Sequence, residues 1–308
     1  MMIDISIIIV NYNVKDLLIQ CLRSIYATNQ NALTIEVIVV DNDSKDDSVS
    51  AVVAEFPNVV LIENKFNAGF SGANNQGMTI AKGDFIFLLN PDTEILGNAL
   101  VDLKTYLDKN TTCSIVGPQL LNSDKSIQVS VWKNHKPVDL VLETFYIHKL
   151  FDLLSYPIEK LNGSFEGKTL SGAALFFRKT LITKMGMLDE KLFWMEDIDF
   201  CFRASKYGSI SYLNTAQVIH HSGQSQKKNY NIAISNQLIS KLKYYKKYSS
   251  VFGSWMAIFF CFIFIISRIV VFTLVSAIRP IWAAKARAYY YSFGKFFKYI
   301  FFNNTNIA

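Results

Sequence analysis

Polar and acidic residues follow four apolar, β-branched segments of the chain, and their types could serve binding and catalysis. The first segment is followed by Asn11-Tyr12-Asn13, and the second by Asp41. The carboxylate of Asp41 could accept hydrogen bonds from a ribose hydroxyl or from an N–H group of a base. Alternatively, this stretch only begins a helix, with Asp43 or Ser44 as the N-cap.

Two further groups have the chemistry of metal ligands. Asp92 ends the tripeptide Asn90-Pro91-Asp92 after the fourth apolar segment, and His220-His221 is an adjacent histidine pair. A hard cation such as Mg²⁺ or Mn²⁺ prefers oxygen ligands and can bridge a diphosphate, and imidazole is a common metal ligand. The alternative for Asp92 is a helix N-cap after a strand that ends at Pro91. Neither HExxH nor a Cys/His zinc spacing occurs in the sequence.

Three acids lie within four positions, at Glu196, Asp197 and Asp199. Carboxylates crowded beside a substrate can supply a general base. The structural alternative is that they compensate the dipole at the start of a helix.

The segment from Asn67 to Gly77 is rich in small residues and includes Gly69, Phe70 and Asn75. It matches neither GxGxxG nor the GxxxxGK[ST] phosphate loop, which weakens a hydride-transfer or ATPase interpretation. Small residues at the start of a helix permit close approach of a nucleotide. Tight packing of helix on sheet is the alternative.

Alternating strand and helix patterns must position these groups. We predict strands at 5–10, 35–40, 59–63 and 85–89, and helices at 15–27, 46–56 and 71–81. This order favours an α/β fold with a parallel sheet covered on both faces, in which ligands bind at the carboxyl ends of the strands. Residues 122–168 are less regular. We then predict strands at 169–177, 210–213 and 218–219, and helices at 179–185 and 196–207.

The charge distribution divides the chain in two. The residues up to Asp199 contain all 25 acids and 17 of the 31 Lys and Arg, a net charge of −8, whereas the remainder carries 14 Lys and Arg and no acid. A basic tail indicates an anionic partner. Because the basic residues flank a 24-residue apolar run at 255–278, long enough to span a bilayer, the pattern favours a membrane over nucleic acid. Arg268 lies inside this run, and a spanning, re-entrant or interfacial arrangement stays open.

The compartment is indicated by the cysteines and the N-terminus. Cys21, Cys113, Cys201 and Cys261 show no CxxC pairing, which is typical of reduced thiols in the cytosol. The opening MMIDISIIIVNYN carries Asp4 and no basic leader, so we expect no signal peptide.

Taken together, the segments resemble glycosyltransferase family 2, and most closely its bacterial rhamnosyltransferase-like branch. The likeness covers roughly residues 3–225 and rests on seven motifs in register, which are IIIVNYN, VIVVDNDS, NAGFSGANNQG, FLLNPDT, SGAALFFRK, GMLDEKLFWMEDIDFCFR and VIHHSGQS. It implies a GT-A fold with a mixed, mainly parallel sheet over 1–230, with a donor-binding half at 1–110 and an acceptor half at 111–230. Residues 231–308 would be a basic, hydrophobic membrane-associating region.

The resemblance also implies roles for single residues. The nucleotide-sugar would be bound by Asn11, Tyr12, Asn13, Asp41, Asn67, Gly69, Phe70, Asn75, Asn90 and Asp92. Asp92 is the second acid of the family's DxD motif and would hold Mg²⁺ or Mn²⁺ together with His220; Asn90 replaces the first acid. Asp197, beside Glu196, corresponds to the catalytic base. The acceptor site would be lined by Gly172, Ala173 and Trp194.

The expected activity is an inverting hexosyl transfer from a dTDP- or UDP-sugar, with rhamnose as the first guess, to a glycan or polyprenyl-diphosphate-linked acceptor. The expected location is the cytoplasmic face of the inner (plasma) membrane. A nucleotidyltransferase is disfavoured because Asn11-Tyr12-Asn13-Val14 lacks a Gly-rich basic loop. A non-catalytic, nucleotide-sugar-binding membrane scaffold is the remaining alternative.

Overall fold

The computed structural model of the protein divides into two units. It describes residues 2–29, 33–133, 136–145, 155–156, 165–221 and 230–302. The first unit comprises Met1–Lys133, Ser155–Glu190 and Glu196–Ser225, and the second comprises Asn134–Leu154, Lys191–Met195 and Gln226–Ala308. The second unit thus contains the whole region 231–308, and it also takes in Asn134–Leu154 and Lys191–Met195 from within the sequence range of the acceptor half.

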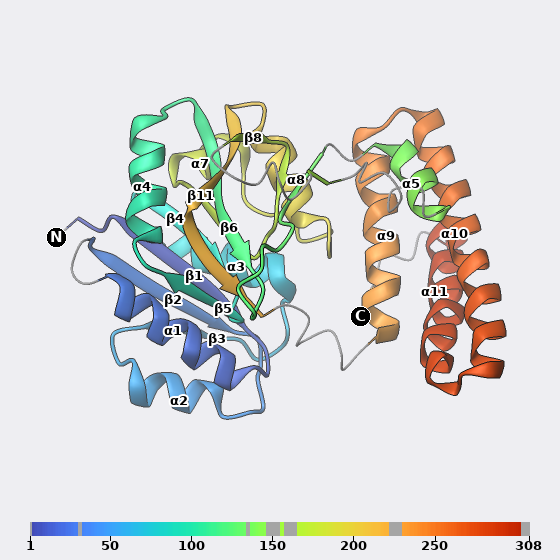
Figure 1. Cartoon of the computed structure of the whole chain (residues 1–308), viewed down its shortest axis with the longest axis horizontal. Coiled ribbons are helices and arrows are strands. Elements are labelled where there is room, and N and C mark those ends of the chain that lie inside the picture. Colours follow the sequence, from blue (N-terminus) through green and yellow to red (C-terminus); the bar gives the residue numbers. More distant parts are fainter. Residues whose placement is uncertain are drawn as a thin grey trace. The chain divides into compact units, whose positions relative to one another are not determined.

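The N-terminal part of the first unit has the predicted alternation of strands and helices (Figure 1). The strands are β1 (Ile5–Asn11), β2 (Ile35–Asp41), β3 (Val60–Glu63) and β4 (Phe85–Leu89). The helices between them are α1 (Lys15–Asn29), α2 (Ser48–Glu55) and α3 (Gly69–Ile80). The pairs β1–β2, β1–β4 and β2–β3 are all parallel, so the polar residues that follow these strands gather at one edge of the sheet.

The sheet continues with strands of mixed direction. In order of sequence the elements are β5 (Thr93–Leu96), α4 (Ala99–Lys109), β6 (Cys113–Leu121), β8 (Phe165–Gly167), β10 (Ala174–Arg178), α7 (Thr180–Met185), α8 (Glu196–Ala204) and β11 (Ser209–His220). The strand order is β3-β2-β1-β4-β10-β6-β11-β5, with β8 also paired to β11. Strand β10 runs antiparallel between β4 and β6, whereas β11 is parallel to β6. The predicted mixed, mainly parallel sheet is confirmed.

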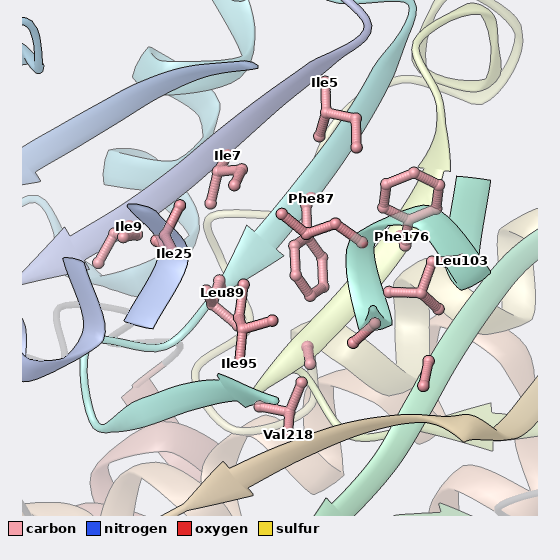
Figure 2. Close-up of a cluster of buried hydrophobic side chains, with 14 of the residues drawn as sticks. Ile5, Ile7, Ile9, Ile25, Phe87, Leu89, Ile95, Leu103, Phe176 and Val218 are labelled. Atoms are coloured by element: carbon pink, nitrogen blue, oxygen red, sulfur yellow. The ribbon is translucent and has the colours of Figure 1, made fainter. Parts of the chain in front are cut away.

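Apolar residues pack on both faces of this sheet. Alternate residues of β1 face opposite sides, so Ile5, Ile7 and Ile9 pack with residues of α1, α2 and α4, while Ile8 packs with residues of α3, α7 and α8. Figure 2 shows the first cluster, in which Phe87 of β4 and Phe176 of β10 lie beside Leu103 of α4. Both layers of helices therefore fix the sheet whose edge carries the candidate site.

Two strand predictions were wrong in detail. The predicted strand 169–177 is two strands, because Ser171, Gly172 and Ala173 form a turn between β9 (Thr169–Leu170) and β10. Strand β9 pairs instead with β7 (Val131–Trp132) in a small separate sheet. The predicted strands 210–213 and 218–219 are one strand, β11, whose pairing with β6 shifts register between Leu213 and Gln217. A bulge hides such a continuous strand from sequence periodicity.

The second unit contains helices. They are α5 (Pro137–Thr144), α9 (Tyr230–Tyr248), α10 (Val251–Ile278), the short 3₁₀ helix η3 (Pro280–Trp282) and α11 (Ala283–Phe302). Helix α10 continues without a break past Ser267 and Arg268, so the apolar run is neither a hairpin nor interrupted there. Among the described residues it is the one helix that is long and apolar enough to cross a membrane, judged by length and composition.

Candidate active site

Asp92 and His220, the two predicted metal ligands, lie side by side. His220 ends β11 and pairs in register with Thr93 of β5, directly after Asp92. The His220 Nε2 atom lies 3.4 Å from Asp92 Oδ1. His221 points elsewhere, since its Nε2 lies 2.6 Å from Glu94 Oε1. Its backbone N–H, in turn, donates to the Asp92 carbonyl, which joins the two chain segments.

A divalent cation fits this pair as an incomplete ligand set. The facing atoms are a carboxylate oxygen and an imidazole nitrogen, which suit Mn²⁺ and, less well, Mg²⁺. Among the described residues no group of three or more His, Cys, Asp or Glu could hold a metal. Oxygens of a bound diphosphate or of water could complete the ligand set of a cation at Asp92 and His220.

Asn11 and Asp41 form a buried pair where β1 and β2 end. Asn11 Nδ2 donates to Asp41 Oδ1 at 2.7 Å and to Ser44 Oγ at 3.0 Å, and the Ser44 N–H donates to Asp41 Oδ2 at 2.9 Å. Asn11 Oδ1 is buried and has no hydrogen-bond partner in the described part of the chain. A buried, unpaired amide oxygen is costly, and a ligand N–H or O–H group would satisfy it.

The alternative that Asp43 or Ser44 caps a helix is wrong. Helix α2 begins at Ser48, and the Ser48 N–H donates to Asp46 Oδ1 at 3.3 Å. The Ser44 hydroxyl instead accepts from Asn11 and from the Asn13 backbone N–H. These contacts join the loops after β1 and β2 and hold the Asn11–Asp41 pair in place.

The other residues predicted to bind the nucleotide divide into two groups. Asn13 Oδ1 accepts from the Lys45 N–H at 2.7 Å, and Asn67 Oδ1 accepts from the Gly69 N–H at 2.9 Å. Both side chains therefore shape the loops, and Gly69 supplies a φ of +74° that other residues rarely adopt. Tyr12, by contrast, is 46% exposed beside the Asn11–Asp41 pair, so its ring is open to a ligand. Phe70 is half-buried and packs against the core cluster that contains Ile8.

Asn75 has a use that the sequence did not reveal. Its Nδ2 donates to the Leu188 carbonyl at 3.0 Å and to Glu190 Oε1 at 2.9 Å, and its Oδ1 accepts from the Leu188 N–H at 3.0 Å. The whole amide is thus engaged in holding the loop that precedes the acidic segment. The structure does not show this side chain open to a nucleotide.

Asp197 accepts two backbone hydrogen bonds at the start of α8. The Gly172 N–H donates to Oδ2 at 3.0 Å, and the Ile198 N–H donates to Oδ1 at 2.8 Å. Burial nevertheless raises the pKa of this carboxyl, because desolvation outweighs the two hydrogen bonds. A Cβ atom at Gly172 would lie 3.2 Å from the Asp197 Cβ, so only glycine permits this approach without displacement.

The same turn connects Asp197 to the metal-ligand pair. Next to Gly172, the Ala173 carbonyl accepts from the Asn90 N–H at 2.9 Å. Asn90 lies two residues before Asp92 and its own carbonyl accepts from Thr93 Oγ1 at 2.7 Å. The candidate base, the predicted acceptor turn and Asp92 are therefore parts of one hydrogen-bonded assembly.

The three clustered acids have different environments. Glu196 is half-buried at the first position of α8. Asp199 is fully buried and accepts from Arg203 Nε at 2.7 Å, and Arg203 also donates to the carbonyls of Met185 and Met187. Asp199 therefore has a structural role, which leaves Asp197 and Glu196 as the acids with a possible place in catalysis.

The family model described as glycosyl transferase family 2 matches residues 6–180, which is more than half of the chain. The chain belongs to glycosyl transferase family 2. The recognition made from the seven motifs is thereby confirmed.

Curated relatives within this family agree with that assignment. The N-acetylglucosaminyl-diphospho-decaprenol L-rhamnosyltransferase of Mycobacterium tuberculosis is 28% identical over 211 residues, which cover 62% of this chain and 68% of that protein. The low-salt glycan biosynthesis hexosyltransferase Agl10 of Haloferax volcanii is 24% identical over 234 residues, covering 74% and 70% of the two chains.

A solved structure supports the fold. The mannosyltransferase PcManGT from Pyrobaculum calidifontis, in complex with GDP-Man and Mn²⁺, has a TM-score of 0.59 at 14% identity and covers 99% of this chain and 89% of that one. At such low identity the likeness concerns the fold alone. The predicted GT-A fold of this family 2 member is confirmed.

One predicted acceptor residue lies outside the first unit. Trp194 belongs to the segment Lys191–Met195 of the second unit. Its backbone has a φ of +79°, and its ring lies 6.4 Å from that of Phe193, measured between centroids. A bulky residue in the left-handed region is uncommon and is often found at functional sites.

Sequence reasoning missed two residues of the site. Asn42 binds the loop before α3, since its Nδ2 donates to the Gly69 carbonyl at 3.2 Å and its Oδ1 accepts from the Ala68 N–H at 3.3 Å. Its place in the polar stretch after β2 was a signal for it. Gln128, which contacts His220, lies in the irregular region 122–168, where no sequence pattern indicated it. The segment 222–225 of the motif VIHHSGQS lies outside the described residues.

Proposed function

We propose that this family 2 glycosyltransferase is a metal-dependent, inverting hexosyltransferase of cell-surface polysaccharide synthesis. The observation that carries the proposal is the assembly in which Gly172 and Ala173 connect Asp197 to Asn90, two residues before Asp92. With one turn connecting them, the base can act on the attacking hydroxyl while the cation-binding carboxylate acts at the departing diphosphate. We propose a dTDP- or UDP-sugar as the donor, with rhamnose as the first sugar to test.

In this mechanism Asp197 takes the proton of an acceptor hydroxyl. Its raised pKa brings it closer to the range in which a general base is effective at neutral pH. The hydroxyl oxygen bonds to the anomeric carbon while the bond from that carbon to the diphosphate oxygen breaks, so the configuration inverts in one displacement. Mn²⁺ or Mg²⁺ held by Asp92 and His220 would neutralise the charge on the departing nucleoside diphosphate.

The donor would bind along the edge formed by β1, β2 and α3. Asn11 offers an unpaired buried acceptor, and Asp41 beside it offers carboxylate oxygens to a ribose or base. The exposed ring of Tyr12 could stack on the base. The side chains of Asn13 and Asn67 would act indirectly, by holding the loops.

We further propose that the acceptor is lipid-linked and that the protein works at the cytoplasmic face of the plasma membrane. The M. tuberculosis relative is named for a diphospho-decaprenol-linked acceptor. The second unit of this chain exposes apolar residues of α10 such as Trp255 at 66% and Ile278 at 83%. No acidic residue follows Asp199 in the sequence, which suits an anionic membrane surface.

The test measures nucleotide release from a panel of UDP-, dTDP- and GDP-sugars with Mn²⁺ or with EDTA, in detergent and with a polyprenyl-diphosphate-linked acceptor. The native protein is compared with Asp197→Asn and with a matched control, Asp108→Asn, which changes an exposed acid of α4 that pairs with Lys104. Turnover of one donor that requires metal, survives in the control and is lost in Asp197→Asn supports the proposal. Donor binding without turnover would favour the non-catalytic scaffold.

A further inference from the structure

The loop after β6 contacts His220 through a chain of side-chain hydrogen bonds. The loop is a tight turn, in which the Asn122 N–H donates to the Ser126 carbonyl and the Lys125 N–H donates to the Asn122 carbonyl, each at 2.8 Å. At its end, Gln128 Oε1 lies 2.8 Å from His220 Nδ1.

The direction of each hydrogen bond in this series follows from Asp124, its first residue. Asp124 Oδ1 can only accept when the carboxyl is ionised, and it lies 2.5 Å from Ser126 Oγ, which must donate. Hydrogen bonds from Ser126 also lower the pKa of Asp124. The Ser126 oxygen then accepts from Asn122 Nδ2 at 2.9 Å.

The next two steps carry this direction to the imidazole. Because Asn122 donates through Nδ2, its Oδ1 is the atom that accepts from Gln128 Nε2 at 2.9 Å. Gln128 Nε2 also donates to the His220 carbonyl at 3.3 Å, which fixes the amide orientation twice. Gln128 Oε1 must therefore accept from His220, so Nδ1 carries the hydrogen.

We propose that the relay of Asp124, Ser126, Asn122 and Gln128 fixes His220 in the Nδ1–H tautomer and presents Nε2 as a metal ligand beside Asp92. Gln128 is thus a positioning residue of the site. The inference rests on the proposed metal-dependent function. A lone pair on Nε2 then faces an oxygen of Asp92 at 3.4 Å, so a cation between the two atoms would be bound by both.

The decisive variant is Gln128→Leu, which removes the acceptor at similar size. Loss of a partner that orients a ligating histidine typically lowers metal affinity by about 10- to 100-fold. We expect that loss for Mn²⁺, measured by electron paramagnetic resonance of the free ion, with Mn²⁺ alone and with dTDP or UDP added. Gln128→Glu keeps an acceptor for Nδ1–H and should retain most of the affinity. The matched control Gln217→Leu removes a glutamine of β11 that contacts Gln119 and not His220.

A second readout needs no metal. Imidazole ¹⁵N NMR of the metal-free protein should show the Nδ1–H form for His220 in the native chain and a mixture in Gln128→Leu. Ser126→Ala, an exposed change that leaves the sheet intact, should shift the same resonance in part. Unchanged tautomer and unchanged Mn²⁺ affinity in Gln128→Leu would overturn the inference. Native protein that shows the Nδ1–H form but binds no Mn²⁺ would instead refute the proposed metal dependence.

An independent observation concerns α10. Its buried stripe is Ala257, Cys261, Ile265 and Arg268. The Arg268 guanidinium donates to the carbonyls of Thr144 and Glu143, at 2.7 and 3.1 Å, where α5 ends. The side chain of Glu143 in turn pairs with Lys241 of α9. The charged side chains of Arg268, Glu143 and Lys241 therefore lie together beside the apolar helix α10.

The geometry points to an α10 that lies along one face of an anionic bilayer and does not cross it. Crossing would carry Arg268, Glu143 and Lys241 to hydrocarbon depth, where charged side chains are costly to insert. Lying on the surface keeps these residues under protein, while the opposite stripe, with Phe252, Trp255 and Phe259, enters the lipid.

The chain offers a clean topology test, because Cys21, Cys113, Cys201 and Cys261 are all buried and give little background labelling. Single cysteines replace Val251 and Arg279, at the two ends of α10, in the full chain expressed in bacteria. A membrane-impermeant maleimide is applied to spheroplasts and to inverted vesicles. We expect both positions to react in the inverted vesicles alone. Reaction of one position from each side would show that α10 spans the membrane.

Discussion

The two units differ in what they bury. The first unit buries polar side chains at its sheet edge, including Asn11, Asp41 and Asp92, and gives each a directed contact. The second unit leaves large apolar side chains exposed, such as Phe252 and Ile278, while it buries Arg268. The first unit therefore has buried polar groups held by hydrogen bonds, whereas the second has an apolar surface, and we propose that chemistry belongs to the first and membrane location to the second.

The largest expected effect tests whether chemistry belongs to the first unit alone. Asp197→Asn removes the proposed base, and we expect kcat to fall by about 10²- to 10⁴-fold. Binding of the protein to anionic vesicles should not change. Initial rates and vesicle co-sedimentation measured on the same preparations check both statements, and a variant that lost vesicle binding as well would break the separation.

The converse change tests whether location belongs to the second unit. Phe252 is 73% exposed on α10 and Phe66 is 66% exposed in the first unit, so Phe252→Ser and Phe66→Ser are matched variants. If Phe252 enters lipid, its loss costs about 2 kcal/mol, or about 30-fold in vesicle affinity. We expect no such loss for Phe66→Ser. Equal affinities for the two variants, measured by co-sedimentation with phosphatidylglycerol vesicles, would contradict the assignment.

The same contrast explains what the sequence could predict. Strands such as β4 were predicted to the residue because fully buried parallel strands form continuous apolar runs. The approach of Asp92 to His220 followed from the family motifs. The roles of Asn75 and Gln128 did not, because they depend on contacts between residues about 90 or more positions apart. The contacts of Arg268 with the carbonyls at the end of α5 were likewise not predicted. The amino-acid composition indicates only that a charged residue lies within an apolar run.

A smaller effect tests how closely the first unit is packed around its base. A Cβ atom at Gly172 would lie 3.4 Å from Asp197 Oδ2 as well as 3.2 Å from its Cβ, so Gly172→Ala should displace the carboxyl by a few tenths of an ångström. We expect kcat to fall by about 10-fold with little change in KM for the donor. The control is Gly294→Ala in α11, where an added Cβ meets no atom within 4 Å. Equal rates for the two variants would show that the position of Asp197 is not critical.

The smallest effect is a displacement along the pH axis. Burial raises the pKa of Asp197 above the ordinary value of about 3.9. Because the ionised form is the base, activity is lost as the pH falls through this raised pKa, so the acidic limb of kcat/KM should lie at higher pH than an ordinary aspartate would give. The same shift makes ionisation unfavourable for folding, and stability should therefore decline as the pH rises through the folded-state pKa. Vesicle binding by α10, which depends on apolar side chains, should stay constant across that window. An acidic limb near pH 4 would contradict the raised pKa of Asp197. A limb shared by catalysis and vesicle binding would show that the two units do not act separately.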